Sequence, residues 1–250
     1  MSRLLQAFGL TLAVATLCAL ATSCGSRYSA QMRVLNAIPD GQAVDVQVNG
    51  TKAFSKLQFT DFAPTPQPGY ATVPSGGITV KAFLTGTSTT APPTSSFTVN
   101  GSTQYTVIMQ GFNRDTVGID APIAVPYTDN NTAPASGKLE FRVINASPSS
   151  PGGLVDVYFE PNPFNGDVTN LTPQISGLGY TQASPYQTLT ANAQGSGFQV
   201  IVTASGNKTV LIQQNYPSGT TGGTIATLVL VDVVNGGQMS PTPLLLNDLN

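Results

Sequence analysis

Hydrophobic and polar residues alternate with a period of two in many short stretches of this chain. In residues 43–48, Val44, Val46 and Val48 alternate with Asp45 and Gln47, as in a strand with one buried face. Pro and Gly separate the runs, and no capped helical stripe follows residue 24, so the pattern predicts an all-β chain forming sandwiches or barrels. The other predicted strands are 31–36, 70–73, 78–84, 96–99, 105–109, 139–145, 155–159, 198–204, 209–214 and 224–234.

Two Asn-Gly pairs stand at the ends of predicted strands. Asn49-Gly50 follows residues 43–48, and Asn100-Gly101 lies between 96–99 and 105–109. Asn-Gly readily supplies the positive φ angles of a two-residue turn. We therefore predict a hairpin at each pair, the second joining 96–99 to 105–109.

The chain also contains an internal repeat. The block Arg33-Val34-Leu35-Asn36-Ala37-Ile38-Pro39 returns as Arg142-Val143-Ile144-Asn145-Ala146-Ser147-Pro148, and a Val-Asp-Val triplet follows each copy, at 44–46 and 155–157. The two offsets nearly agree (33 to 142, and 44 to 155), as expected for a duplication with a small loop insertion. The repeat predicts β domains at 31–126 and 138–250, joined by a polar linker at 127–137 that is rich in small residues.

The first 24 residues have the layout of a secretory signal. Arg3 precedes an uncharged run, and small residues close the run at Cys24, similar to the processing site of bacterial lipoproteins. We predict a signal peptide at 1–23, lipidation of Cys24 and a tether at 24–30. Ordinary secretion and a retained membrane helix are the alternatives. Gly25 in place of Asp favours the outer membrane by analogy, and stable attachment requires more than one acyl chain.

Composition narrows the functional classes. Both cysteines, Cys18 and Cys24, lie at or before the predicted cleavage point, so no disulfide is expected after it. Charged residues make up 9% of the chain and the net charge is −2, which gives no basic surface for nucleic acid. Abundant neutral polar residues are typical of an exported β protein.

Catalytic chemistry has little support in the residue types present. The chain has no His, and no cysteine follows Cys24. The part after the signal therefore lacks the usual general base, soft metal ligand and triad, so we predict no catalytic residue, no cofactor and no metal site. The repeated Asp45 and Asp156 are expected to face solvent or to pair with Arg33 and Arg142. A carboxylate-based hydrolase is the remote alternative. Loop aspartates that could attract calcium are interpreted as turn residues, namely Asp40, Asp129, Asp167 and Asp248.

Tyrosines beside Pro or Gly suggest a second functional class. Tyr180, Tyr186 and Tyr216, like Tyr127, have such neighbours, and loops at one end of a sandwich often carry function. The alternative function is therefore a carbohydrate- or small-ligand-binding module built on Tyr180, Tyr186 and Tyr216. Clustering of these three on one face would support it, and scatter would contradict it.

Four linked motifs resemble the bacterial DUF4397 family of exported proteins. They are the Arg33–Asp40 block, Val44-Asp45-Val46 with Asn49-Gly50, Tyr70 ahead of Val73-Pro74-Ser75-Gly76, and Tyr105-Thr106-Val107. The resemblance covers 33–111 and, in the second repeat, 142–158, after which 160–179 is interpreted as an expanded loop. It implies two immunoglobulin-like or related β-sandwich domains and no known catalytic residue. Asn36 and Asn145 stand where many members carry His, so no role of that His is transferred.

Together these features predict a lipid-anchored protein of the bacterial cell envelope with a structural, adhesive or scaffolding role. Its expected partners are the membrane, through the N-terminal lipid, and an envelope protein or polysaccharide.

Overall fold

The computed structural model describes residues 28–66, 69–115, 117–150, 153–162, 164–190, 197–216, 223–233 and 244–248. The predicted signal peptide and Cys24 lie outside these residues. No helix in the described part is long and apolar enough to cross a membrane.

Strands of the N-terminal half form two sheets. The inner sheet contains β1 (Ser29–Ala37), β4 (Phe62–Ala63), β5 (Ala71–Pro74), β8 (Gln104–Gln110) and β9 (Ile123–Thr128). The outer sheet contains β2 (Val44–Val48), β3 (Thr51–Leu57), β6 (Gly76–Leu84) and β7 (Thr90–Val99).

Strands of the C-terminal half form two further sheets. The inner sheet contains β10 (Lys138–Asn145), β13 (Gln187–Thr190), β16 (Ile225–Leu230) and β17 (Leu244–Asn247). The outer sheet contains β11 (Leu154–Pro161), β12 (Ile175–Gly179), β14 (Phe198–Ala204) and β15 (Val210–Tyr216).

The two halves have the same strand order. The inner sheets run β4-β1-β8-β9 and β13-β10-β16-β17, and the outer sheets run β3-β2-β6-β7 and β12-β11-β14-β15. One pairing in each inner sheet is parallel, β1 with β8 and β10 with β16, whereas the remaining pairings are antiparallel. The predicted all-β, sandwich-like fold is confirmed, and the arrangement is compatible with the immunoglobulin-like fold expected.

Each half buries its own apolar core between its sheets. Val34 of β1, Val46 of β2 and Val107 of β8 are fully buried in the N-terminal core. The C-terminal core is more aromatic, with Phe141 on β10 in edge contact with the rings of Phe159 and Phe198. The period-two pattern of the sequence therefore places its apolar residues as expected.

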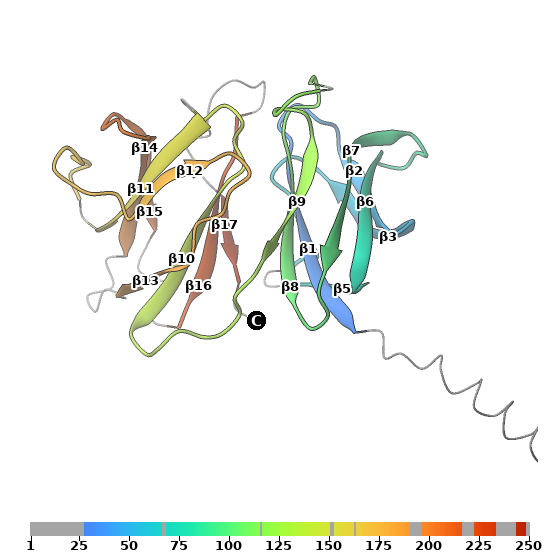
Figure 1. Ribbon diagram of the computed structural model, residues 1–250, viewed down its shortest axis with the longest axis horizontal. Helices are drawn as coiled ribbons and strands as arrows, with labels where there is room; N and C mark the ends of the chain where they lie inside the picture. Colours follow the sequence, from blue (N-terminus) through green and yellow to red (C-terminus); the bar gives the residue numbers. More distant parts are fainter. Residues whose placement is uncertain are drawn as a thin grey trace, which may run out of the picture.

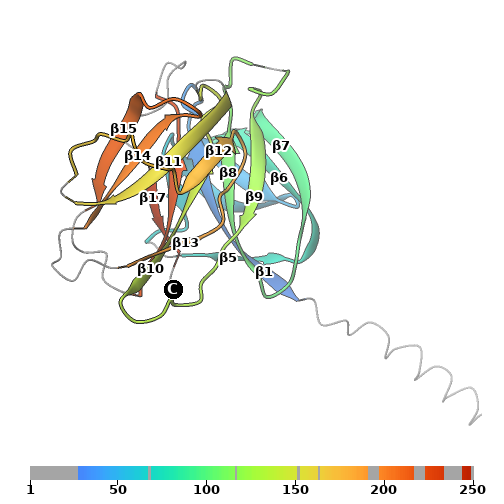
Figure 2. The same cartoon turned by 60° about the vertical axis from the view of Figure 1, so that its left-hand side comes forward.

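The inner sheets face each other, so that the halves share a third apolar layer. Figure 1 shows β1, β8 and β9 opposite β10, β16 and β17, and in Figure 2 the C-terminal half has turned in front of the N-terminal half. The interface includes Leu35 and Ile108 from the N-terminal half and Ile144, Val229 and Leu246 from the C-terminal half, all buried. Inner strands are therefore covered on both faces, once by their own core and once by the other half.

The hairpin predictions have different outcomes. Asn49 (φ 50°) and Gly50 (φ 79°) form the tight turn expected between β2 and β3, so the first hairpin is confirmed. The second is wrong, because β7 pairs with β6 while β8 pairs with β1 and β9. All residues of β8 after Gln104 are buried, and a strand buried on both faces belongs in the middle of the inner sheet.

Two segments expected to lack strands contain them. β9 continues to Thr128, so residue 127, where we predicted the linker to start, lies inside a strand. β12 lies within 160–179, the segment interpreted as an expanded loop. Both strands are short, and each pairs antiparallel with the strand that precedes it, β9 with β8 and β12 with β11.

Candidate functional site

Alternate residues along the whole of β8 face the C-terminal half. Tyr105, Val107 and Met109 point into the N-terminal core. Because side chains alternate along a strand, Thr106, Ile108 and Gln110 point toward the C-terminal half. All three are fully buried.

Arg33 extends from β1 into the other half. Its Nε donates to Thr106 Oγ1 (2.8 Å), its Nη1 to the carbonyl of Asn247 (2.5 Å), and its Nη2 to a carboxylate oxygen of Asp248. Its guanidinium lies 5.2 Å from the centre of the Tyr70 ring. Arg33 is only 1% exposed, so the buried charge depends on the C-terminal half for its closest counter-charge.

Arg142 makes the reciprocal set of contacts from β10. Its Nε donates to Thr227 Oγ1 (2.7 Å), its Nη1 to the carbonyl of Thr128 (2.7 Å), and its Nη2 to Asp129. Its guanidinium lies 4.8 Å from the centre of the Tyr186 ring. Each arginine thus binds the aspartate that follows the last strand of the opposite half.

The two aspartates are satisfied by their own halves as well. Tyr70 donates its hydroxyl to Asp129 Oδ2 (2.7 Å), and Tyr186 donates to Asp248 Oδ2 (2.8 Å). We call Arg33, Asp129, Arg142 and Asp248 the central charge cluster. Its two positive and two negative charges are balanced, as buried ions require.

Electrostatics within the central charge cluster favour the charged state of arginine. Burial alone would lower the pKa of Arg33, but the carboxylates of Asp129 and Asp248 outweigh it and raise that pKa. Burial also raises the pKa of the Tyr70 and Tyr186 hydroxyls, which therefore remain proton donors to the aspartates. The arrangement joins the two halves and leaves neither carboxylate open to a substrate.

The expected pairing of Asp45 with Arg33, and of Asp156 with Arg142, is wrong. Asp45 accepts from Lys52 Nζ (2.8 Å) and from the backbone N–H of Lys56 (3.0 Å). β2 lies in the outer sheet with its valines in the core, so Asp45 points away from Arg33. It does not face open solvent either, since it is only 7% exposed.

Asp156 repeats this arrangement in the C-terminal half. It accepts from the backbone N–H groups of Gly177 (2.8 Å) and Gly206 (3.0 Å), and it is 5% exposed. Burial alone would raise its pKa, but these two N–H groups outweigh burial and lower it. Both repeated aspartates therefore hold turns of the outer sheets.

The three tyrosines proposed to bind a ligand do not share a face. Tyr186 contacts the central charge cluster, whereas Tyr216 is buried in the C-terminal core and stacks on Phe198 with ring centres 5.3 Å apart. Tyr180 lies at the interface, next to Thr181, whose carbonyl accepts from the hydroxyl of Tyr127 (3.0 Å). The scatter contradicts a ligand platform built on these residues.

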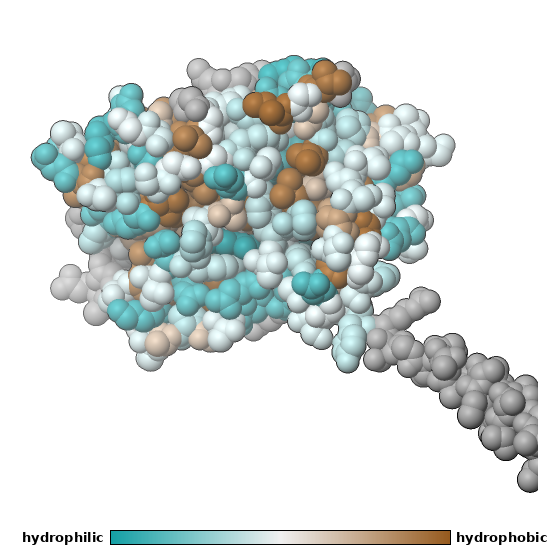
Figure 3. Space-filling view, viewed as in Figure 1, coloured by the Kyte–Doolittle hydropathy of each residue, from teal (hydrophilic) through white to brown (hydrophobic). Residues whose placement is uncertain are grey.

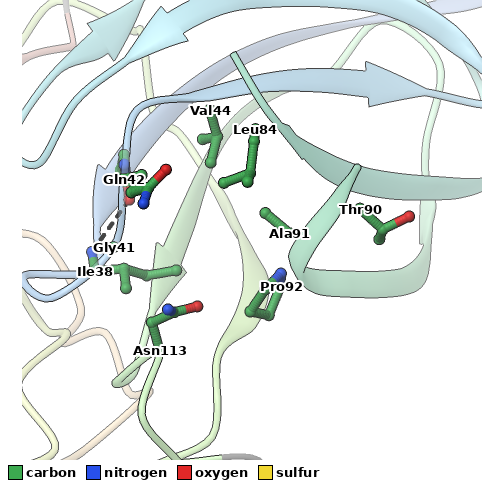
Figure 4. Close-up of a pocket in the computed structure, with 10 residues that line it drawn as sticks. Ile38, Gly41, Gln42, Val44, Leu84, Thr90, Ala91, Pro92 and Asn113 are labelled. Carbon is green, nitrogen blue, oxygen red and sulfur yellow. Dashed lines mark hydrogen bonds between the residues drawn. The ribbon is translucent and has the colours of Figure 1, made fainter. Parts of the chain in front are cut away.

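A cavity of about 230 Å³ opens at one end of the N-terminal sandwich. Figure 4 shows it between the end of β1, the start of β2 and the β6–β7 connection. Its lining contains no carboxylate: Asn36, Ile38, Gly41, Gln42, Val44, Leu84, Thr90, Ala91, Pro92 and Asn113. Asn36 donates to the carbonyl of Leu57 (3.1 Å) and accepts from the N–H of Ile38 (3.2 Å), so its amide holds the end of β1.

The loop between β8 and β9 exposes apolar side chains. Val117 and Ile119 are each 83% exposed, and Figure 3 shows hydrophobic atoms at the upper edge of the molecule over this loop. Gly111 (φ 111°) starts the loop, and a Cβ there would lie 2.7 Å from the carbonyl oxygens of Asp120 and Ala121. The loop therefore closes tightly at its base while presenting two aliphatic side chains.

The sequence patterns missed the acidic members of the central charge cluster. Asp129 and Asp248 were assigned to turns, although each follows a strand that closes a half. The recurrence of Thr106 and Asp129 as Thr227 and Asp248, at nearly constant offsets, could have identified these aspartates as part of the repeat.

Comparison with curated proteins gives no match. Among solved structures, one described as "Alpha-glucan binding by a streptococcal virulence factor" is similar at 11% identity, covering 85% of this chain and 96% of that chain. Its TM-score is 0.25, which carries no information about fold or ligand. A family model matches residues 30–158, just over half of the chain, and is described as a domain of unknown function. The chain therefore belongs to the DUF4397 family.

Proposed function

We propose that this chain is a non-catalytic protein of the bacterial cell envelope, anchored by a lipid on Cys24. In this proposal two β domains, at 31–126 and 138–250, form one rigid body, and the second is a divergent copy of the family domain. The body holds a partner-binding end away from the membrane, an adhesive or scaffolding role. The observation that carries the proposal is the central charge cluster, because its reciprocal Arg–Asp contacts stiffen the connection between the halves.

The placement of the two ends of β1 supports this orientation. The strand begins at Ser29, a short tether after Cys24, and ends at Ala37, next to the cavity. Nine residues of strand span roughly 30 Å. The cavity and the loop bearing Val117 and Ile119 would then lie at the membrane-distal end.

The distal end has the chemistry of a protein-binding surface. Exposed aliphatic side chains at a loop tip gain free energy when a partner removes them from water. The cavity beside β1 is large enough for one apolar side chain of such a partner. No lining residue is a carboxylate, a histidine or a cysteine, which fits binding better than hydrolysis.

Cross-linking in intact envelope tests the binding role. We expect a partner that cross-links to the wild-type chain to be lost from the double variant Val117→Ser, Ile119→Ser. Leu211→Ser is the matched control, since Leu211 is 36% exposed on β15 of the other half. If the loop variant keeps the partner, or if both variants lose it, the distal surface has no binding role.

The cavity gives a second arm of the same experiment. Ala91 is buried beside the cavity, and Ala91→Leu should fill part of it and weaken the same cross-link. Unchanged cross-linking in a folded Ala91→Leu chain would limit the partner surface to the loop.

The anchor is tested separately by metabolic labelling with a fatty-acid probe. We expect the wild-type chain to carry label and to fractionate with membranes, and Cys24→Ala to lose both properties. Label that persists in Cys24→Ala would exclude lipidation at this residue.

A further inference from the structure

A second polar group of side chains lies in the interface, beyond the central charge cluster. Gln110 is fully buried, and its amide lies beside the hydroxyls of Tyr127 and Tyr180, but neither its Oε1 nor its Nε2 makes a hydrogen bond of normal geometry. The same holds for Tyr180 Oη and for Oδ2 of Asp232, a residue that is 1% exposed. Such atoms cost free energy unless something binds them.

These residues come together from both halves. Gln110 follows Thr106 and Ile108 on the interface face of β8, roughly 13 Å beyond the central charge cluster at the strand's usual rise. Asp232 follows β16 and accepts from Ser147, which follows β10, so it lies where these two inner strands of the C-terminal half end. Tyr180 directly precedes Thr181, which binds the Tyr127 hydroxyl of the N-terminal half.

Asp120 adds a second carboxylate from the N-terminal half. Its carbonyl accepts from the N–H of Phe112 (2.7 Å), which holds the base of the β8–β9 loop against the end of β8. Burial raises the pKa of the Tyr180 hydroxyl, and the carboxylates of Asp120 and Asp232 raise it further. Both acids are therefore within electrostatic reach of Tyr180.

The negative charge of this group lacks a protein counter-charge. Asp232 Oδ1 accepts from Ser147 Oγ (2.5 Å), while Oδ2 is unpartnered. Burial raises the pKa of Asp232 and the charge of Asp120 adds to this rise, while hydrogen bonds from Ser147 and Ser149 offset only part of it. Among the described residues, no Lys or Arg forms an ion pair with either aspartate.

We propose that Asp232, Gln110 and Tyr180, together with Asp120, bind a calcium-like divalent cation between the two halves. Calcium takes carboxylate, amide and hydroxyl oxygens in irregular geometry, with water completing the shell. Two carboxylates balance its charge. Zinc prefers Cys and His ligands, and none of these four residues is of that type.

The site has a structural consequence. Asp120 belongs to the N-terminal half and Asp232 to the C-terminal half, so a shared cation fastens the β8–β9 loop to the opposite half. Cation binding therefore stabilises the end of the interface farthest from the central charge cluster. The inference does not depend on lipidation or on a protein partner.

Terbium luminescence tests the site directly, because Tb³⁺ replaces Ca²⁺ and is excited through nearby tyrosines. The chain contains no Trp, so tyrosine is the sensitiser. We expect saturable emission that Ca²⁺ displaces and Mg²⁺ displaces poorly. Asp232→Asn should weaken Tb³⁺ binding about tenfold or more, since even residues behind metal ligands affect affinity by that factor.

Two further variants control this experiment. Asp167→Asn changes a turn aspartate in the C-terminal half that binds Thr169, and it should leave emission unchanged. Tyr180→Phe removes both a ligand oxygen and a sensitising ring, so it should lower the emission intensity and also raise the Tb³⁺ concentration needed for half-saturation. Absence of saturable emission from the folded wild-type chain at millimolar Tb³⁺, or equal emission from Asp232→Asn, overturns the proposal.

Thermal unfolding gives an independent test. The measured quantity is the change in Tm on adding Ca²⁺, which is compared within each variant and so does not require equal folding stability. Ca²⁺ should raise the Tm of the wild-type chain, and Asp232→Asn should lose this response. Without Ca²⁺ the variant should unfold at the same or higher temperature, because it no longer buries an uncompensated carboxyl group. A Ca²⁺ response that persists in Asp232→Asn would contradict the proposed site.

Discussion

The two halves share their strand order but differ in how strictly their residues repeat. At the interface the repetition is close: Arg33 and Arg142 make the same three kinds of contact, and each binds the terminal aspartate of the other half. In the cores the repetition is loose. An interface charge needs a partner at one position in the other half, whereas a core position needs only apolar volume.

The core difference is clearest around Phe141. Strand register aligns Phe141 with Met32, and Phe198 with Ile78. The Phe141 ring meets Phe198 at 5.2 Å and 83°. The N-terminal core fills the same space with unbranched and β-branched aliphatic side chains. An aromatic core and an aliphatic core therefore occur with the same strand order.

The largest loss of folding stability is expected from removing an arginine of the central charge cluster, the feature that the halves share. Arg33→Ala leaves Asp248 buried without its counter-charge and should lower the free energy of unfolding by about 3–5 kcal/mol. Arg142→Ala should cost a similar amount through Asp129. Urea denaturation measures both, with the half-exposed Arg114→Ala as control. A loss confined to one arginine would show that the two contacts are not equivalent.

Exchanging core residues between the halves should have an intermediate effect. Phe141→Met removes its edge-to-face ring contacts and should cost about 1–3 kcal/mol. Met32→Phe adds a ring to a core without space for it and should cost about 1–3 kcal/mol. Thermal unfolding monitored by circular dichroism tests both. If either exchange is neutral, the two cores are interchangeable at this position and the comparison fails there.

The lowered pKa of Asp45, one of the two repeated aspartates of the outer sheets, should make the free energy of unfolding depend on pH. Hydrogen bonds from Lys52 and from the N–H of Lys56 lower the pKa of Asp45 to about 2. A folded pKa below the unfolded value of about 3.9 stabilises the fold above that value, and this stabilisation is lost as pH falls through about 2. Asp45→Asn should therefore cost about 1–2 kcal/mol at pH 7 and little near pH 2.

Asp156→Asn sharpens this test in the other half. Its pKa is lowered by backbone N–H groups that outweigh burial, so the destabilisation should again be present at pH 7 and shrink in acid. Urea midpoints at pH 7 and pH 2 measure both variants. A destabilisation that stays constant with pH would mean that neither carboxylate acts through its charge.

The smallest effect is expected from the ion pair between Lys52 and Asp45, which the halves do not share. Lys52 binds Asp45 and is 55% exposed, whereas the described contacts of Asp156 include no lysine. Lys52→Ala should cost about 0.2–1 kcal/mol at low salt, and less at high salt because ions screen exposed pairs. A loss that does not respond to salt would show that Lys52 acts through packing.

The strand pattern and the repeat were readable from local residue order. Alternation in 43–48 and the Asn49-Gly50 turn predicted β2 and its hairpin, because both depend on neighbouring residues. The same turn signal failed at Asn100-Gly101, where burial on both faces of β8 decides its partner. The short strands β9 and β12 were missed, since Pro and Gly interrupt the local alternation and each strand is fixed by pairing with the strand before it.

An all-β chain with a repeated Arg block, a repeated Val-Asp-Val strand and few charges can be predicted from the order of its residues. Those properties follow from residue type and spacing. Tertiary structure alone decided that Arg33 binds Asp248 and not Asp45, and that Gln110, Tyr180 and Asp232 lie at one interface. The reason is physical: a buried charge selects its partner by distance in three dimensions, and that distance depends on which sheet faces which.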